Sequence, residues 1–262
     1  MTSRALFREA IHAMEAGFRR LEDRVPRPHL VTKGDGVSLR YSDRTVHQAM
    51  LLKLARYISG LNACDLLLLA GFVQEQSVIQ RTLDENHEAI LFLVFGAQDG
   101  LTKVHRKYLS AFWQEEFEEG VAPIDNTKGR YIYPSEVRKW VEERMGGGPD
   151  HIGAKAARVV NQAYSGYVHS AAPHIMDMCG GPELRFYLRG LNGTSRMPAH
   201  VHDLWNYIYR GFLAAITVAK SFGDEETANQ LYEATARFEA ASGSTFMASA
   251  KREANNPNSL GA

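Results

Sequence analysis

The sequence predicts an all-α protein, a multi-helix bundle around one long central helix. Apolar residues recur at three- and four-residue spacing through most of the 262 residues, which is the period of an amphipathic helix. Runs that alternate apolar and polar residues, as strands do, are scarce. Prolines and glycines gather in short segments, such as 146–149, and so divide the chain into helical stretches.

The first half of the chain is expected to form helices at 2–24, 43–59, 62–97 and 102–119. The connection at 25–42 holds two prolines and two glycines, so we expect it to be irregular. Asp43 caps the second helix, and Gly60 with Asn62 marks a break before the third. The third helix would be about 50 Å long at 1.5 Å per residue, which makes it the central element.

The second half is expected to form helices at 135–145, 150–170, 199–222 and 224–241. Glycines and prolines between the second and third of these favour a small hairpin near 174–190. Because no internal repeat is visible, we expect one helical domain over 1–242, with the Gly-Gly-Gly-Pro break at 146–149 as the alternative boundary. A polar, mobile tail would follow at 243–262.

Composition indicates an ordinary globular chain in a reducing compartment. It is 45% hydrophobic and 23% charged, which excludes disorder, and its 30 basic and 30 acidic residues leave no net charge to attract a polyanion. Cys64 and Cys179 belong to no CxxC or metal-type spacing. We therefore expect free thiols and no disulfide.

The sequence predicts neither a secretory signal nor a membrane span. Arg8, Glu9 and Glu15 interrupt the apolar positions near the N-terminus. The longest apolar runs, 66–73 and 89–97, are far shorter than the ~20 residues that span a bilayer. We therefore expect a cytoplasmic protein with no membrane partner.

Polar groups interrupt the apolar face of the predicted central helix at its middle. Ser77, Asp84 and Glu88 share one line with apolar residues on a helical wheel. Arg81 lies one turn away and can pair with Asp84, Glu85 or Glu88. Because an unpaired buried charge is costly, this belt is either a satisfied structural network, which we favour, or the floor of a solvent-filled site.

A second polar stripe runs along the helix predicted at 150–170. Its members are Arg158, Gln162, Ser165 and His169, and an apolar back of alanine, valine and tyrosine lies opposite. Gly166 weakens the middle of this helix, which suggests that another backbone or a ligand approaches there.

Two short segments carry a family resemblance. Arg81-Thr-Leu-Asp-Glu85, followed by Tyr164-Ser-Gly-Tyr-Val-His169, resembles the bacterial helical family called domain of unknown function fifty-six seventy-seven. The resemblance covers roughly residues 45–220. It implies a helical bundle in which the two motifs meet, and it implies no activity. Ser165 directly follows Tyr164, which departs from the family spacing.

A weaker similarity is to HEPN-type helical proteins, many of which are metal-independent ribonucleases of toxin or defence systems. Arg81 and His87 fit their Arg-x5-His pattern. In that chemistry the histidine moves the proton of an RNA 2′-hydroxyl and the arginine stabilises the charge on phosphorus. The carboxylates that share this turn would repel phosphate, which counts against RNA as the substrate.

A metal-dependent enzyme is the third hypothesis. Asp84-x-x-His87 and Glu85-x-x-Glu88 place ligands one helical turn apart, as four-helix carboxylate sites do. Such sites need a similar pair on another helix, and no further Glu-x-x-His occurs. We therefore expect no bound metal and no cofactor.

The sequence as a whole favours a small-ligand or partner-binding module with a partly buried cluster of Arg81, Glu85, Ser165 and His169. Candidate ligand-binding residues are Arg81, Asp84, Glu85, Glu88, Arg158, Gln162, Ser165 and His169, and catalytic candidates are Arg81, His87 and His169. The aromatic residues Trp205, Tyr209 and Phe212 follow one helical face. We expect them in the core, with a homodimer interface as the alternative.

Overall fold

A computed structural model describes residues 3–33, 36–115, 134–145 and 152–245 and confirms the all-α class. Its helices are α1 (Ser3–Glu22), α2 (Val46–Ala70), α3 (Val73–Asp99), α4 (Lys103–Phe112), α5 (Pro134–Arg144), α6 (Ile152–Val168), α7 (Ala172–Met176), α8 (Met197–Ser221) and α9 (Glu225–Ser242). In these residues, strands form only two antiparallel pairs, β1 (His29–Lys33) with β2 (Gly36–Arg40) and β3 (Cys179–Gly180) with β4 (Arg185–Phe186).

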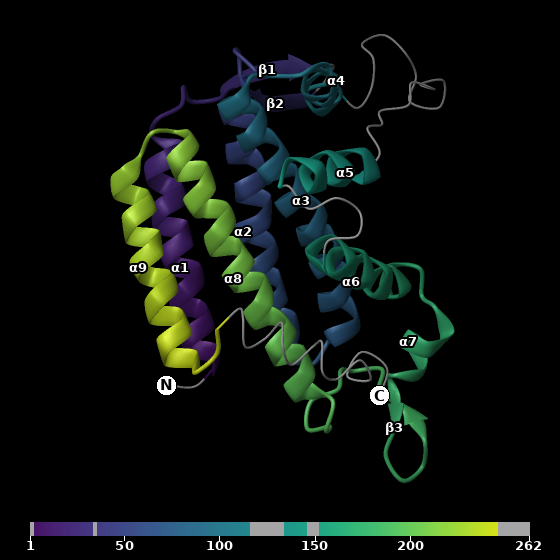
Figure 1. The fold of residues 1–262 in the computed structure, drawn as a ribbon. Helices are drawn as coiled ribbons and strands as arrows, with labels where there is room; N and C mark the ends of the chain where they lie inside the picture. The colour runs from purple at the N-terminus through teal and green to yellow at the C-terminus, as the bar shows by residue number, and fades with distance from the viewer. Residues whose placement is uncertain (1–2, 34–35, 116–133, 146–151, 246–262) are drawn as a thin grey trace, which may run out of the picture.

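The long helices lie side by side (Figure 1). The pairs α1–α9, α8–α9, α1–α2 and α2–α8 pack on one another, and α3 packs against both α2 and α8. The large side chains Tyr57, Phe92, Phe212 and Phe238 are fully buried between them. Each such residue contributes roughly 1.5–3 kcal/mol of apolar burial, so this interior holds the bundle together.

The prediction of one long central helix at 62–97 is wrong, because the chain forms a hairpin of two helices, α2 and α3, over this region. Gly71, at φ +79°, ends α2 in the left-handed conformation, and its N–H donates to carbonyls of the last turn. Gly60 does not break α2, since its missing side chain makes room for Leu83 on α3, whose Cδ2 would lie 2.5 Å from a Cβ. Thr45, rather than Asp43, caps α2 through a reciprocal pair with Gln48.

The prediction of an irregular connection at 25–42 is also wrong in part. Residues His29–Lys33 and Gly36–Arg40 pair as a hairpin with Leu30 opposite Leu39. The alternation of valine, leucine and threonine with polar residues is typical of a strand, and the prolines lie before it. The small hairpin expected near 174–190 is confirmed by the β3–β4 pair.

Other boundaries follow the sequence closely. The helices predicted at 2–24, 199–222 and 224–241 match α1, α8 and α9 within two residues at each end. The helix predicted at 102–119 ends earlier, at Phe112, with Trp113 as its C-cap. Asp150 as a cap, and the tail beyond 245, lie outside the described residues.

Two further predictions concern the state of the cysteines and the presence of membrane-spanning helices. Cys64 is a buried free thiol and Cys179 a partly exposed one, as expected. Of the helices in the described part of the chain, none has the length and apolar character needed to cross a bilayer.

Candidate functional site

The three carboxylates of the polar belt on α3 each pair with an arginine. Asp84 accepts hydrogen bonds from Arg210 of α8 and from the Tyr207 hydroxyl, the latter at 3.0 Å. Glu88 receives Nε and Nη2 of Arg138 from α5 at 2.7 and 3.2 Å, and Glu85 lies 2.9 Å from Nη1 of Arg81. These pairs balance the charge of the belt. The described residues contain no group of three histidine, cysteine or acidic side chains that could hold a metal.

Of the two segments with the family resemblance, the helix that carries the second, α6, packs along α3, which carries the first. When its amide oxygen faces the arginines, Asn161 accepts from Arg138 Nη2 at 2.6 Å and from Arg81 Nη2 at 3.1 Å. Tyr164 is buried, and its ring lies 5.8 Å from the ring of Tyr207 on α8. Asn161 and Tyr164 therefore connect the belt on α3 to α6 and α8.

The stripe predicted on α6 faces away from this contact. Arg158, Gln162 and His169 are exposed and Ser165 is half-buried. Arg158 lies 3.6 Å from Glu142 of α5, and His169 comes eight residues after Asn161, about 12 Å along a helix. The structure therefore does not bring His169 to Arg81. Tyrosines face inward instead, since they bury more apolar surface than the polar stripe would.

A close approach does occur at Gly166, but it is made by a side chain and not by the backbone or ligand that the sequence suggested. A Cβ on this residue would lie 2.1 Å from Cε1 of His174, whose ring packs edge-on against Tyr167. The approaching group is thus a side chain of α7. This contact fixes α7 against the end of α6.

A continuous line of polar groups lies between α3 and α8, and we call it the polar seam. It comprises Gln76, Gln80, Asp84 and His87 of α3, His200, Tyr207 and Arg210 of α8, and Tyr57 of α2. The α3 members are spaced by four, four and three residues, so they share one face of the helix. All four are buried. Sequence reasoning missed most of the seam, although this spacing of Gln76, Gln80, Asp84 and His87 was visible.

Part of the polar seam is fully hydrogen-bonded. Tyr207 donates to Asp84, and the hydroxyl of Tyr57 donates to the backbone carbonyl of Tyr207 at 2.9 Å. Burial, and then the Asp84 charge, raise the pKa of Tyr207 well above its usual value, so it remains a donor. Burial opposes the charge of Arg210, but Asp84 together with Tyr57 and Tyr207 outweighs this effect, so the pKa of Arg210 is raised. Asp84 and Arg210 therefore form a lasting ion pair at one end of the seam.

In the rest of the polar seam, Gln76 donates through Nε2 to the carbonyl of His200 at 3.3 Å, but several other side-chain atoms lack partners. Gln76 Oε1, both side-chain amide atoms of Gln80, Nδ1 of His87 and Nδ1 of His200 are buried and make no hydrogen bond to the described residues. The nearest acid to His200 Nδ1, Asp203, lies 3.6 Å away, beyond hydrogen-bond reach. Each unsatisfied buried group costs about 1–3 kcal/mol. Such groups are rare in proteins and mark places where water or a ligand belongs.

His87 predicts how stability depends on pH. Burial, and then the Arg210 charge, lower the pKa of His87 well below 6.5. In mild acid the His87 side chain is protonated in the unfolded chain but stays neutral in the native protein. The free energy of unfolding therefore falls as the pH drops below about 6.5. Burial also lowers the pKa of His105, so the measurement compares wild type with His87→Gln. Urea denaturation at about pH 7.5 and 5.5 should show a smaller acid loss in the variant, and equal losses would contradict this account.

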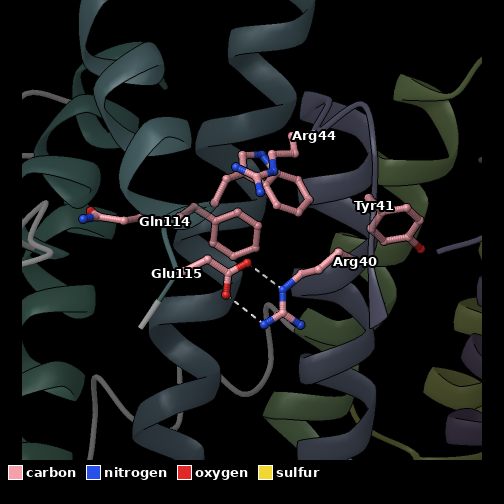
Figure 2. A pocket seen from close by; sticks show the side chains of 7 residues that line it. Arg40, Tyr41, Arg44, Gln114 and Glu115 are labelled. Atoms are coloured by element: carbon pink, nitrogen blue, oxygen red, sulfur yellow. Dashed lines mark hydrogen bonds and ion pairs between the residues drawn. The ribbon is translucent and has the colours of Figure 1, made fainter. Parts of the chain in front are cut away.

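A second polar region lies at the end of the bundle that carries β1, β2 and α4 (Figures 1 and 2). Two adjoining hollows of about 280 and 520 Å³ share the side chains of Arg40, Tyr41, Arg44 and Glu115. We call them together the hairpin pocket. None of its residues was a candidate from sequence, because the hairpin itself was not expected.

Comparisons with known proteins add no family to this picture. No family model matches the chain, and neither a curated protein nor a solved structure is similar to it. The resemblances to domain of unknown function fifty-six seventy-seven and to HEPN-type proteins therefore stay predictions. The polar seam and the hairpin pocket carry the functional argument.

Proposed function

We propose that the protein binds a small polar molecule in the polar seam between α3 and α8. The observation that carries this proposal is Gln80, a fully buried residue whose amide oxygen and nitrogen both lack a partner among the described residues. Unpartnered atoms of Gln76 and His87 lie one and two turns away on the same face. A molecule with both donors and acceptors would satisfy all of them at once.

The charges of the seam indicate that this molecule is neutral. Asp84 is paired with Arg210, and the neighbouring Glu88 is paired with Arg138. The atoms left over belong to the amides of Gln76 and Gln80 and to the imidazoles of His87 and His200, and burial keeps the His87 ring uncharged. A charged ligand buried here would have no counter-ion. A small neutral amide, nucleobase or hydroxylated compound therefore fits better than an anion or a metal ion.

The ribonuclease hypothesis finds less support. Arg81 and His87 are six residues apart, so they point about 120° apart on α3. Arg81 pairs with Glu85, whereas His87 is buried beside Tyr57 with ring centroids 6.2 Å apart. One phosphate could not contact both side chains of a single chain in this arrangement. The lowered pKa of His87 also keeps it from serving as an acid near neutral pH.

We expect Gln80→Leu to make the dialysed protein more stable while abolishing binding. Leucine removes two unpartnered polar atoms, so the free energy of unfolding should rise by about 1–3 kcal/mol. Chemical denaturation measures this, with exposed Gln162→Leu as the control that should change by less than about 0.5 kcal/mol.

Binding is tested by thermal unfolding with millimolar acetamide, uracil or nicotinamide. At least one of these neutral probes should raise the Tm of wild type and of Gln162→Leu but not of Gln80→Leu. A Gln80→Leu protein that is less stable than wild type would mean that the amide already has partners, and the proposal would fail.

A further inference from the structure

The hairpin pocket has the size and lining of a small-molecule site. Its two hollows, of about 280 and 520 Å³, lie near the range of about 300–1,000 Å³ that ligand pockets occupy. The first is lined by Arg40, Tyr41, Arg44, Phe112, Trp113, Gln114 and Glu115, and the second adds His29, Val31 and Ser42. The β1–β2 hairpin and the residues after it, 41–44, meet the end of α4 and the residues after it, 113–115, at this place.

One arginine of the pocket is held in place by an acid. The guanidinium of Arg40 donates through Nε and Nη2 to the two carboxylate oxygens of Glu115 at 2.7 and 2.8 Å. Figure 2 shows this pair face to face across the pocket. A third bond joins Arg40 Nη1 to the carbonyl of Leu39 at 2.8 Å. Arg40 is therefore fixed and its charge is balanced, so it forms a wall of the pocket.

The other arginine is available. Arg44 is exposed and makes no hydrogen bond or ion pair with the described residues. Figure 2 shows it above the Arg40–Glu115 pair, at the other end of the group of lining side chains. Its backbone adopts φ +51°, a conformation that costs a non-glycine residue energy. One uncompensated positive charge at a hollow is a binding point for an anion, and a guanidinium suits the two oxygens of a phosphate or carboxylate.

Aromatic rings supply the apolar part of the pocket. Trp113 lies edge-on to Tyr41 with centroids 6.5 Å apart and edge-on to Phe112 at 5.0 Å. These three side chains are half-buried, so each keeps some ring surface open to the pocket. Flat ligand rings gain stacking and apolar contact on such surfaces.

We infer that the hairpin pocket binds a small anion that carries a flat ring, of the size and chemistry of a mononucleotide. Arg44 contacts the phosphate or carboxylate, and the aromatic side chains hold the ring. This site is independent of the polar seam, whose ligand is neutral. The two sites therefore differ in the charge of the ligand that they prefer.

The test is isothermal titration calorimetry of the full chain with 5′-AMP at low and at about 150 mM salt. Wild type should bind AMP. Arg44→Gln should raise the dissociation constant about tenfold or more, because a charged contact is lost. Arg44→Lys should recover part of the affinity. The matched control is Arg189→Gln, an exposed arginine after β4, which should leave binding unchanged.

Adenosine and inorganic phosphate separate the two parts of the inference. Each should bind more weakly than AMP. Adenosine binding as tight as AMP would overturn the anion contact, and phosphate binding as tight would overturn the ring contact. Absence of AMP binding by wild type, or equal affinities for wild type and Arg44→Gln with both folded by circular dichroism, would overturn the site itself.

Discussion

Replacing Arg210 by methionine is expected to lower the free energy of unfolding by about 3 kcal/mol. Breaking a buried ion pair from one side usually costs about 3–5 kcal/mol. We expect the lower end because the Arg210 side chain keeps 24% of its surface exposed, whereas that of Asp84 keeps 5%. The variant leaves the Asp84 charge in the core, where the Tyr207 hydroxyl is its one remaining side-chain hydrogen-bond donor among the described residues. Chemical denaturation near pH 7 measures the loss.

The double variant Asp84→Leu/Arg210→Met is the control for this prediction. Removing both charges leaves no unpaired ion, so most of the stability should return. A single Arg210→Met variant within about 1 kcal/mol of wild type would show that Asp84 is satisfied without the arginine. The same result would remove the charge balance from which a neutral ligand was inferred.

Gly71→Ala is expected to cost more stability than any alanine replacement at an open glycine. A Cβ at Gly71 would lie 2.8 Å from the backbone nitrogen of Asn192 and 2.9 Å from that of Leu191. The turn between α2 and α3 would lose its fit to this loop, whose Leu191 N–H donates to the Gly71 carbonyl at 2.8 Å. The left-handed backbone adds a further cost of about 1–2 kcal/mol.

Gly243 provides the matched control, because it has a similar φ of +64° and open space around its missing Cβ. Gly243→Ala should therefore show only the backbone cost, while Gly71→Ala should exceed it by about 1 kcal/mol or more. Thermal and chemical denaturation of both variants measure the difference. Equal losses would mean that the loop does not rest on the α2–α3 turn.

The positions of most helices were predictable, because the three- and four-residue spacing of apolar residues can be read from neighbouring residues alone. The exception at Gly60 and Gly71 has a physical reason: the glycine inside α2 serves packing against Leu83, and the glycine after it ends the helix. Nothing in the neighbouring residues separates these two roles. Carrying one helical wheel across Gly71 therefore produced a single long helix where the chain turns back.

The candidate site was predictable only on α3. Asp84 and His87 could be selected there, because polar residues in an apolar helix are conspicuous. Their partners Tyr207 and Arg210 come more than a hundred residues later and look like ordinary members of an amphipathic helix. On α6 the inward face is set by Tyr164, whose burial outweighs the polar stripe that includes His169.

The measurement that tests the polar seam most directly is a high-resolution crystal structure of the protein grown with the neutral probe that stabilises it most. Density for that molecule is expected between α3 and α8, within about 2.7–3.2 Å of both side-chain amide atoms of Gln80. The same crystals of Gln80→Leu should lack it. A Gln80 amide bonded to other protein groups, or to water molecules alone in the presence of the probe, would contradict the account.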